Sequence, residues 1–63
     1  MDEKLLKKAI RAAKVEKRFD LKMFMIRFKL DKADALKLLM ATVNELEKDG
    51  RLLLNDDNVW MVQ

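Results

Sequence analysis

The sequence predicts an α+β fold in which three helices precede a C-terminal β-hairpin. Proline is absent and the only glycine is Gly50, so most of this 63-residue chain is expected to be helical. After Gly50 come two short apolar runs, at 52–54 and 59–62, separated by four residues typical of turns. We therefore expect a single small domain over residues 1–63, with its helices first and a tight hairpin last.

Each of the three predicted helices has an aspartate at its start. A carboxylate at this position accepts hydrogen bonds from first-turn amides that have no partner within the helix. The three aspartates are Asp2, Asp20 and Asp31. The helices are expected over about 3–17, 21–29 and 32–49, and the hairpin over about 51–62. Gly50 is expected to end the third helix, because glycine enters the left-handed conformation without steric cost.

Apolar residues spaced three and four apart predict the buried face of each helix. In the first helix this face consists of Leu6, Ala9, Ile10 and Ala13. In the second helix it consists of Leu21, Phe24, Met25 and Phe28. In the third helix it consists of Leu36, Leu39, Val43 and Leu46. Phe19 and Phe24 also flank Asp20 at the spacing of a hydrophobic staple, so they are expected to pack together.

The hairpin is apolar on both faces. If Leu54 pairs with Val59, then Leu53 lies opposite Trp60 and Leu52 lies opposite Met61. Alternation does not decide which face packs inward, because every one of these positions is apolar. A two-stranded hairpin is not stable alone, so one face must lie on the helices.

The composition excludes several kinds of chemistry. There is no cysteine, histidine or serine and no glycine-rich phosphate loop, so we expect no enzyme, no metal or other cofactor, and no small-molecule substrate. Asp56 and Asp57, which are flanked by asparagines, are expected to form a turn rather than a metal site. No signal peptide and no stretch of about 20 apolar residues is present, so we expect no membrane contact and a cytoplasmic protein, or a nuclear one in a eukaryote.

Charge is divided unevenly along the chain. Residues 1–30 contain ten basic and four acidic residues, whereas residues 31–63 contain four basic and seven acidic residues, which gives charges of +6 and −3. Basic residues close together on one face of the first helix are Lys4, Lys7, Lys8, Arg11, Lys14 and Arg18. Such a stripe is typical either of a phosphate-binding site or of a solvated helix face. Five further basic residues lie in or beside the second and third predicted helices: Lys22, Arg27, Lys29, Lys32 and Lys37. They could form a positive rim that positions a duplex without reading its sequence, or they could only keep the surface solvated.

The string Val-Asn-Glu-Leu-Glu-Lys-Asp-Gly-Arg-Leu at 43–52 resembles the helix end, glycine turn and first wing strand of the winged helix-turn-helix superfamily. The acidic turn and the ending Val-Trp-Met-Val at 59–62 also resemble the winged helices appended to replication proteins such as replicative helicases. The resemblance covers about two thirds of the chain, from Phe19 onward. It implies a short strand at Phe19, a third helix that enters the DNA major groove, and a wing that touches the backbone. The resemblance therefore implies that the chain is a DNA-binding protein. It would bind duplex DNA as a transcription regulator or as an accessory protein. The residues expected to bind DNA are Arg11, Lys14, Arg18, Lys29, Lys32, Lys37, Thr42 and Asn44.

The alternative is a winged helix that binds protein. Base-reading helices usually expose arginine or small polar residues, whereas the third helix here would expose Leu38 and Ala41. Asp56 and Asp57 at the wing tip would also repel phosphates. The chain would then form a dimer or dock on a larger complex. Its expected interface consists of Met23, Ile26, Leu38, Met40 and Ala41. Leu38, Met40 and Ala41 are equally typical of a wide apolar face that packs in the core of a small domain.

Overall fold

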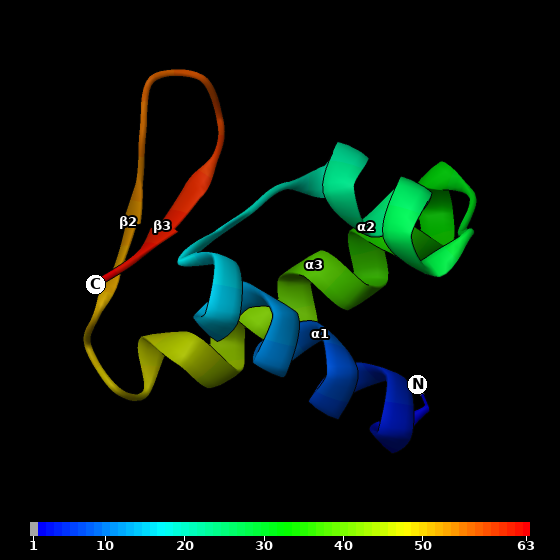
Figure 1. Ribbon diagram of the computed structural model, residues 1–63, viewed down its shortest axis with the longest axis horizontal. Helices are drawn as coiled ribbons and strands as arrows, with labels where there is room; N and C mark the ends of the chain where they lie inside the picture. The colour runs from blue at the N-terminus through cyan, green and yellow to red at the C-terminus, as the bar shows by residue number, and fades with distance from the viewer. Residues whose placement is uncertain (1) are drawn as a thin grey trace.

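The computed structural model describes residues 2–63, and its elements follow the order helix, strand, helix, helix, strand, strand (Figure 1). The helices are α1 (Glu3–Glu16), α2 (Leu21–Phe28) and α3 (Lys32–Glu47). The strands are β1 (Arg18–Phe19), β2 (Leu52–Leu54) and β3 (Trp60–Val62). The fold is therefore α+β with three helices and a small antiparallel sheet. Each helix starts at the expected residue and ends one or two residues earlier than expected.

Aspartates cap all three helices, as the sequence predicts. In each case a carboxylate oxygen accepts a hydrogen bond from a backbone amide two or three residues later. The acceptor and donor residues are Asp2 and Lys4 (2.9 Å), Asp20 and Met23 (2.8 Å), and Asp31 and Asp34 (2.8 Å). Each cap supplies a partner to an amide that the helix leaves unpaired, which typically stabilises a helix by about 1 kcal/mol.

The helices end in two different ways. Lys17 and Lys29 follow α1 and α2 in the left-handed region, with φ of 59° and 53°. This conformation costs a residue with a side chain about 1–2 kcal/mol, because Cβ crowds the following carbonyl oxygen. After α3 the chain instead passes through a turn, in which Gly50 N–H donates to the carbonyl of Glu47, and reverses at Gly50, with φ of 67°. The expected glycine stop therefore lies three residues beyond the end of the helix.

The three strands form one antiparallel sheet with the order β1-β3-β2. Strand β1 adds the short strand expected at Phe19, which lies opposite Trp60. Leu54 also lies opposite Trp60, and Leu52 lies opposite Val62, so the hairpin register differs by one residue from the expected one.

The turn between β2 and β3 explains this shift. Asn55 N–H donates to the carbonyl of Val59 at 3.0 Å, and Asn55 Oδ1 accepts from the amides of Asp57 and Val59. Asn58 adopts a left-handed φ of 61°. Val59 thus lies opposite Asn55 in the same register as the strand pairs, and the loop has three residues, 56–58, of which the last is left-handed, where a four-residue loop was expected. Leu52, Trp60 and Val62 consequently pack on the core, which answers the question that alternation left open.

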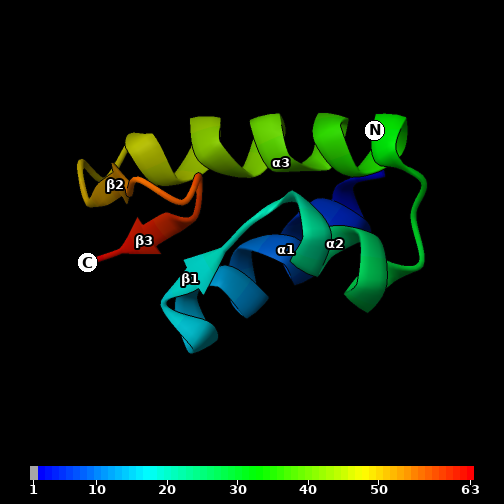
Figure 2. The same cartoon turned by 90° about the horizontal axis from the view of Figure 1, so that it is seen from above.

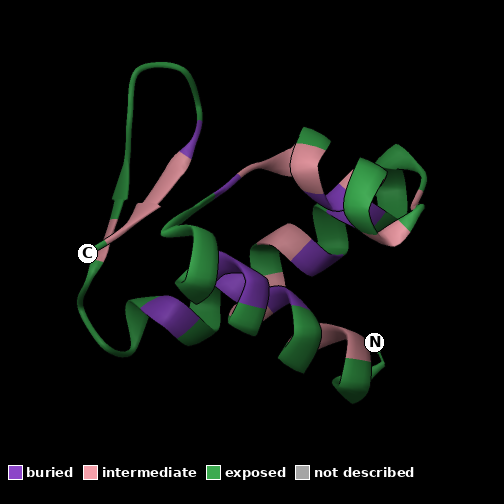
Figure 3. Ribbon diagram, viewed as in Figure 1, coloured by how far each residue is buried: buried purple, intermediate pink, exposed green. Residues whose placement is uncertain are grey.

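The core lies where the three helices meet the sheet (Figure 3). Phe19 is fully buried, and its ring stacks on Phe24 with centroids 5.5 Å apart and on Trp60 at 6.4 Å. The contact with Phe24 is the expected hydrophobic staple. Helix α1 contributes mainly small side chains to the centre, namely Ala9, Ala12 and Ala13. Partly buried apolar side chains from α2 and from the hairpin pack against this same cluster.

Helix α3 is rotated about its axis relative to the prediction. Its buried residues are Ala35, Leu38, Thr42, Val43 and Leu46. Leu36, expected in the core, is 47% exposed, so that prediction is wrong. The helix is apolar on most of its circumference, and the spacing of three and four residues fits two neighbouring faces. The face that is buried includes Thr42, whose hydroxyl donates to the carbonyl of Leu38 at 2.7 Å and so has a partner inside the core.

We predict that Phe19→Ala lowers the free energy of unfolding by about 3–5 kcal/mol, because it removes a buried ring that links β1, α2 and β3. Urea denaturation followed by circular dichroism measures this change. Ile26→Ala is the control, because Ile26 is 67% exposed, and its effect should stay within about 0.5 kcal/mol. Equal losses in the two variants would contradict the assigned role of Phe19.

We predict that Lys29→Gly raises the free energy of unfolding by about 0.5–1 kcal/mol, because glycine tolerates the left-handed conformation that Lys29 adopts. The matched control is Lys37→Gly in the interior of α3, which should lower it by about 1 kcal/mol. Thermal unfolding of both variants beside the parent chain provides the comparison. Destabilisation by Lys29→Gly would argue against the left-handed helix end.

Candidate functional site

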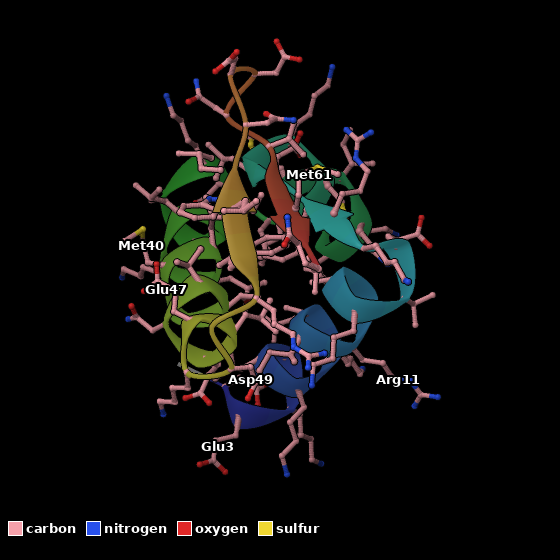
Figure 4. All side chains as sticks on the ribbon, turned by 90° about the vertical axis from the view of Figure 1, so that its left-hand side faces the viewer. Glu3, Arg11, Met40, Glu47, Asp49 and Met61 are labelled. Atoms are coloured by element: carbon pink, nitrogen blue, oxygen red, sulfur yellow. The ribbon has the colours of Figure 1, made fainter. Side chains whose placement is uncertain are left out.

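The exposed side chains of the helices form two surfaces that face different ways. We call the first the basic face, which consists of Lys4, Lys7, Lys8, Arg11 and Lys14 on α1 together with Arg27 on α2. We call the second the α3 face, which consists of Ala33, Leu36, Lys37, Met40, Asn44 and Glu47. Figure 4 shows Arg11 on one side of the molecule and Met40 and Glu47 on the other. A partner on one surface would therefore leave the other free.

The basic face follows from the way α1 packs. Its alanine side is buried, so residues three, four and seven apart on the opposite side lie in solvent. All five basic residues of α1 are on that exposed side. Among residues 2–63 the only ion pair joins Lys48 Nζ to Glu45 Oε1 at 3.1 Å, so no cation of the basic face has an acidic partner within 4.0 Å. These cations are free to bind an external anion.

A shallow hollow lies between α1 and α2 within the basic face. Lys8, Arg11 and Arg27 line it together with apolar groups from Ala12, Val15 and Phe28. Val15 is 67% exposed there rather than part of the core stripe of α1. Cations beside an apolar lining suit a ligand that presents an anionic group on a less polar body, as phosphate on deoxyribose does.

The eight residues expected to bind DNA do not form one site. Arg11 and Lys14 lie on α1, and Arg18 on β1 borders a separate hollow with Lys22 and Ile26. Three basic residues lie elsewhere on the exposed surface, at the end of α2 and along α3: Lys29, Lys32 and Lys37. Asn44 is also exposed on α3. Thr42 is fully buried and bonded to its own helix, so the prediction that it contacts DNA is wrong.

The expected protein interface also needs correction. Leu38 is fully buried between the helices, so it is a core residue and not an interface residue. Met23 and Ala41 are half-buried, and Met23 packs against the core. Ile26 and Met40 are exposed, at 67% and 51%, but Ile26 borders the hollow on α2 whereas Met40 lies on the α3 face. The five residues therefore do not form one surface.

Leu36 is the exposed apolar residue that the sequence reasoning missed. The spacing of three and four residues between positions 36, 39, 43 and 46 predicts that Leu36 lies in the core. The observed stripe at 35, 38, 42 and 46 has the same kind of spacing, with a threonine in it. A threonine fits a buried helix face because its hydroxyl can donate a hydrogen bond to the carbonyl four residues earlier. Thr42 was therefore a signal in the sequence that this face could be the buried one.

The arrangement of the described residues also bears on metal binding and membrane insertion. No group of three or more acidic side chains there is arranged to hold a metal ion. Asp56 and Asp57 lie in the exposed turn between β2 and β3, where the amide of Asp57 donates to the Asn55 side chain. Across residues 2–63, none of the helices has the length and apolar character needed to cross a membrane.

Comparisons with known proteins leave the site to be judged on its geometry. No protein-family model matches the sequence, no curated protein matches it, and no solved structure matches the fold.

We predict that Leu38→Glu prevents folding and that Met40→Glu does not. A glutamate at position 38 would put a charge into a fully buried site, whereas a glutamate at position 40 would lie largely in solvent. Far-ultraviolet circular dichroism and thermal melts of the two variants test the rotation of α3. Two folded variants, or loss of folding in Met40→Glu alone, would contradict the observed orientation.

Proposed function

We propose that this chain is a small winged-helix protein that binds duplex DNA through phosphate contacts of its basic face. The observation that carries the proposal is the set of five exposed cations on α1 without acidic partners among the described residues. From Lys4 to Lys14 they extend over about 15 Å of helix, long enough to follow several phosphates of a duplex. Contacts of this kind position a protein on DNA without reading the base sequence.

The order of the elements supports the winged-helix part of the proposal. A helix, a short strand, two helices and a hairpin follow one another, and β1 pairs with β3 at the edge opposite β2. This is the arrangement that the resemblance in residues 43–52 and 59–62 implies, including the short strand at Phe19. In this reading α2 and α3 form the helix-turn-helix, and the turn between β2 and β3 is the wing tip.

The composition of α3 favours α1 as the main DNA contact. The α3 face presents Leu36, Met40 and Glu47, which match neither phosphates nor the edges of most bases. Asp56 and Asp57 put negative charge at the wing tip, where a duplex would be repelled. Lys29 and Lys32, near the turn between α2 and α3, would add contacts at the margin. The protein would then serve as an accessory or regulatory factor with little sequence preference.

A second candidate function is protein binding through the α3 face. The specific observation in its favour is the exposure of two large apolar side chains, Leu36 at 47% and Met40 at 51%, one turn apart on α3. Such residues on the surface of a small domain favour a partner when they lie next to each other.

The test is a fluorescence anisotropy titration of labelled duplex DNA at several salt concentrations. Five phosphate contacts predict that the logarithm of the binding constant falls with the logarithm of the salt concentration with a slope of about −4.5. The triple variant Lys7→Gln, Arg11→Gln, Lys14→Gln should weaken binding and reduce the slope by about three units, because it removes three of the five cations. The loss should be similar on duplexes of unrelated sequence.

The matched control is the double variant Lys32→Gln, Lys37→Gln on α3, which removes two exposed cations outside the basic face. It should change the slope much less than the α1 variant does. A larger effect of the α3 variant would favour docking by α3. No binding at low salt would refute the proposed function.

A further inference from the structure

Helix α3 has one side that none of residues 2–63 covers. Figure 2 shows α1 and α2 on the same side of α3 and the sheet beside its C-terminal end, with the opposite side of the helix open. At 16 residues the helix is about 24 Å long, close to the longest dimension of the molecule, which is 26 Å. The α3 face is therefore the longest straight surface available for contact.

The centre of this face is apolar. Leu36 and Met40 are one turn apart and are 47% and 51% exposed. Ala33 precedes them and Asn44 follows them on the same side of the helix, and neither is bulky. A second helix on this surface would cover the two large apolar side chains at its centre, and the smaller residues on either side leave room for side chains of that helix.

The α3 face has a positive charge toward one end and a negative charge at the other. Lys37 lies toward the N-terminal end and Glu47 lies at the C-terminal end. The remaining charged pair near the C-terminal end, Glu45 and Lys48, is joined by its own 3.1 Å ion pair and is internally balanced. In the part of the chain from residue 2 onward neither Lys37 nor Glu47 has an ion-pair partner.

We infer that the α3 face binds a second copy of the chain, with the two α3 helices antiparallel about a two-fold axis at Met40. This arrangement puts Met40 against Met40 of the second copy and Leu36 against Asn44 of the second copy. Side chains on a helix lean toward its N-terminus, so in an antiparallel pair Lys37 and Glu47 of the second copy lean toward each other. The two-fold axis repeats every contact, so both unpaired charges of each copy gain a partner.

The size of the surface sets the expected strength. A specific stable interface usually takes about 800 Å² from each partner, and a single pair of helices supplies less than that. We therefore expect a dimer with a dissociation constant in the micromolar range, about 1–100 μM. The inference does not depend on DNA binding, because the basic face lies away from Met40 and Glu47 and remains exposed in both copies.

The experiment is sedimentation equilibrium of the full chain over a concentration range that brackets this dissociation constant, without DNA. The parent chain should pass from the monomer mass of 7.5 kDa to twice that mass. Met40→Glu should raise the dissociation constant more than about tenfold, because it puts two like charges on the axis. Ile26→Glu is the matched control, because Ile26 is an equally apolar and more exposed residue outside the α3 face, and it should leave the mass unchanged.

Charge reversal tests the antiparallel register. Lys37→Glu alone and Glu47→Lys alone should each weaken the dimer by about tenfold, since each replaces two attractions by two repulsions. The double variant should recover the parent dissociation constant to within about threefold. Circular dichroism of every variant establishes that the fold is retained, which is expected because all four substituted positions are exposed.

Three results would overturn the inference. They are a monomer at every concentration, a dimer that Ile26→Glu disrupts and Met40→Glu does not, and a double charge variant that is weaker than both single ones. Because the measurement contains no nucleic acid, its failure and a failure to bind DNA are separate results.

Discussion

The packing of Phe19 against Phe24 and Trp60 is the interaction on which the rest of the structure depends. A chain of 63 residues buries only about 60% of the surface that its unfolded chain exposes, less than a larger domain does, and this one has no cysteine with which to add a disulfide. Phe19 is the first inward residue after α1, and its ring contacts one aromatic side chain from the next helix and one from the last strand. The helices and the sheet are thereby held by one shared set of contacts, in place of two cores that this chain is too short to form.

The rotation of α3 about its axis decides what the protein presents to a partner. An apolar helix can bury either of two neighbouring sides, and the side chosen determines which large residues remain in solvent. Here Leu38 is inside while Leu36 and Met40 are outside. Thr42 fits the inner side because its hydroxyl bonds within the helix. The same rotation separates the α3 face from the basic face of α1, so the two proposed contacts do not compete for one surface.

Local signals in the sequence predict local structure well. Asp2, Asp20 and Asp31 are N-caps because a carboxylate needs only the next few amides to act as one. The hairpin register and the orientation of α3 were not predictable in the same way. The register depends on the left-handed conformation of Asn58 and the pairing of Val59 with Asn55, which residue types alone do not specify. Exposure at Leu36 depends on packing against α1 and α2, which the period of apolar residues does not fix when most of the helix is apolar.

Strand β2 is at the edge of the sheet, and two of its three residues, Leu53 and Leu54, are 55% and 50% exposed. An apolar edge strand with unpaired backbone groups can recruit strands from other molecules and so start aggregation. Here β2 is only three residues long and is bounded by Arg51 on one side and by Asp56 and Asp57 shortly after the other. Charges that flank a short apolar strand repel an incoming copy. The acidic turn between β2 and β3 would therefore oppose aggregation through the edge of the sheet.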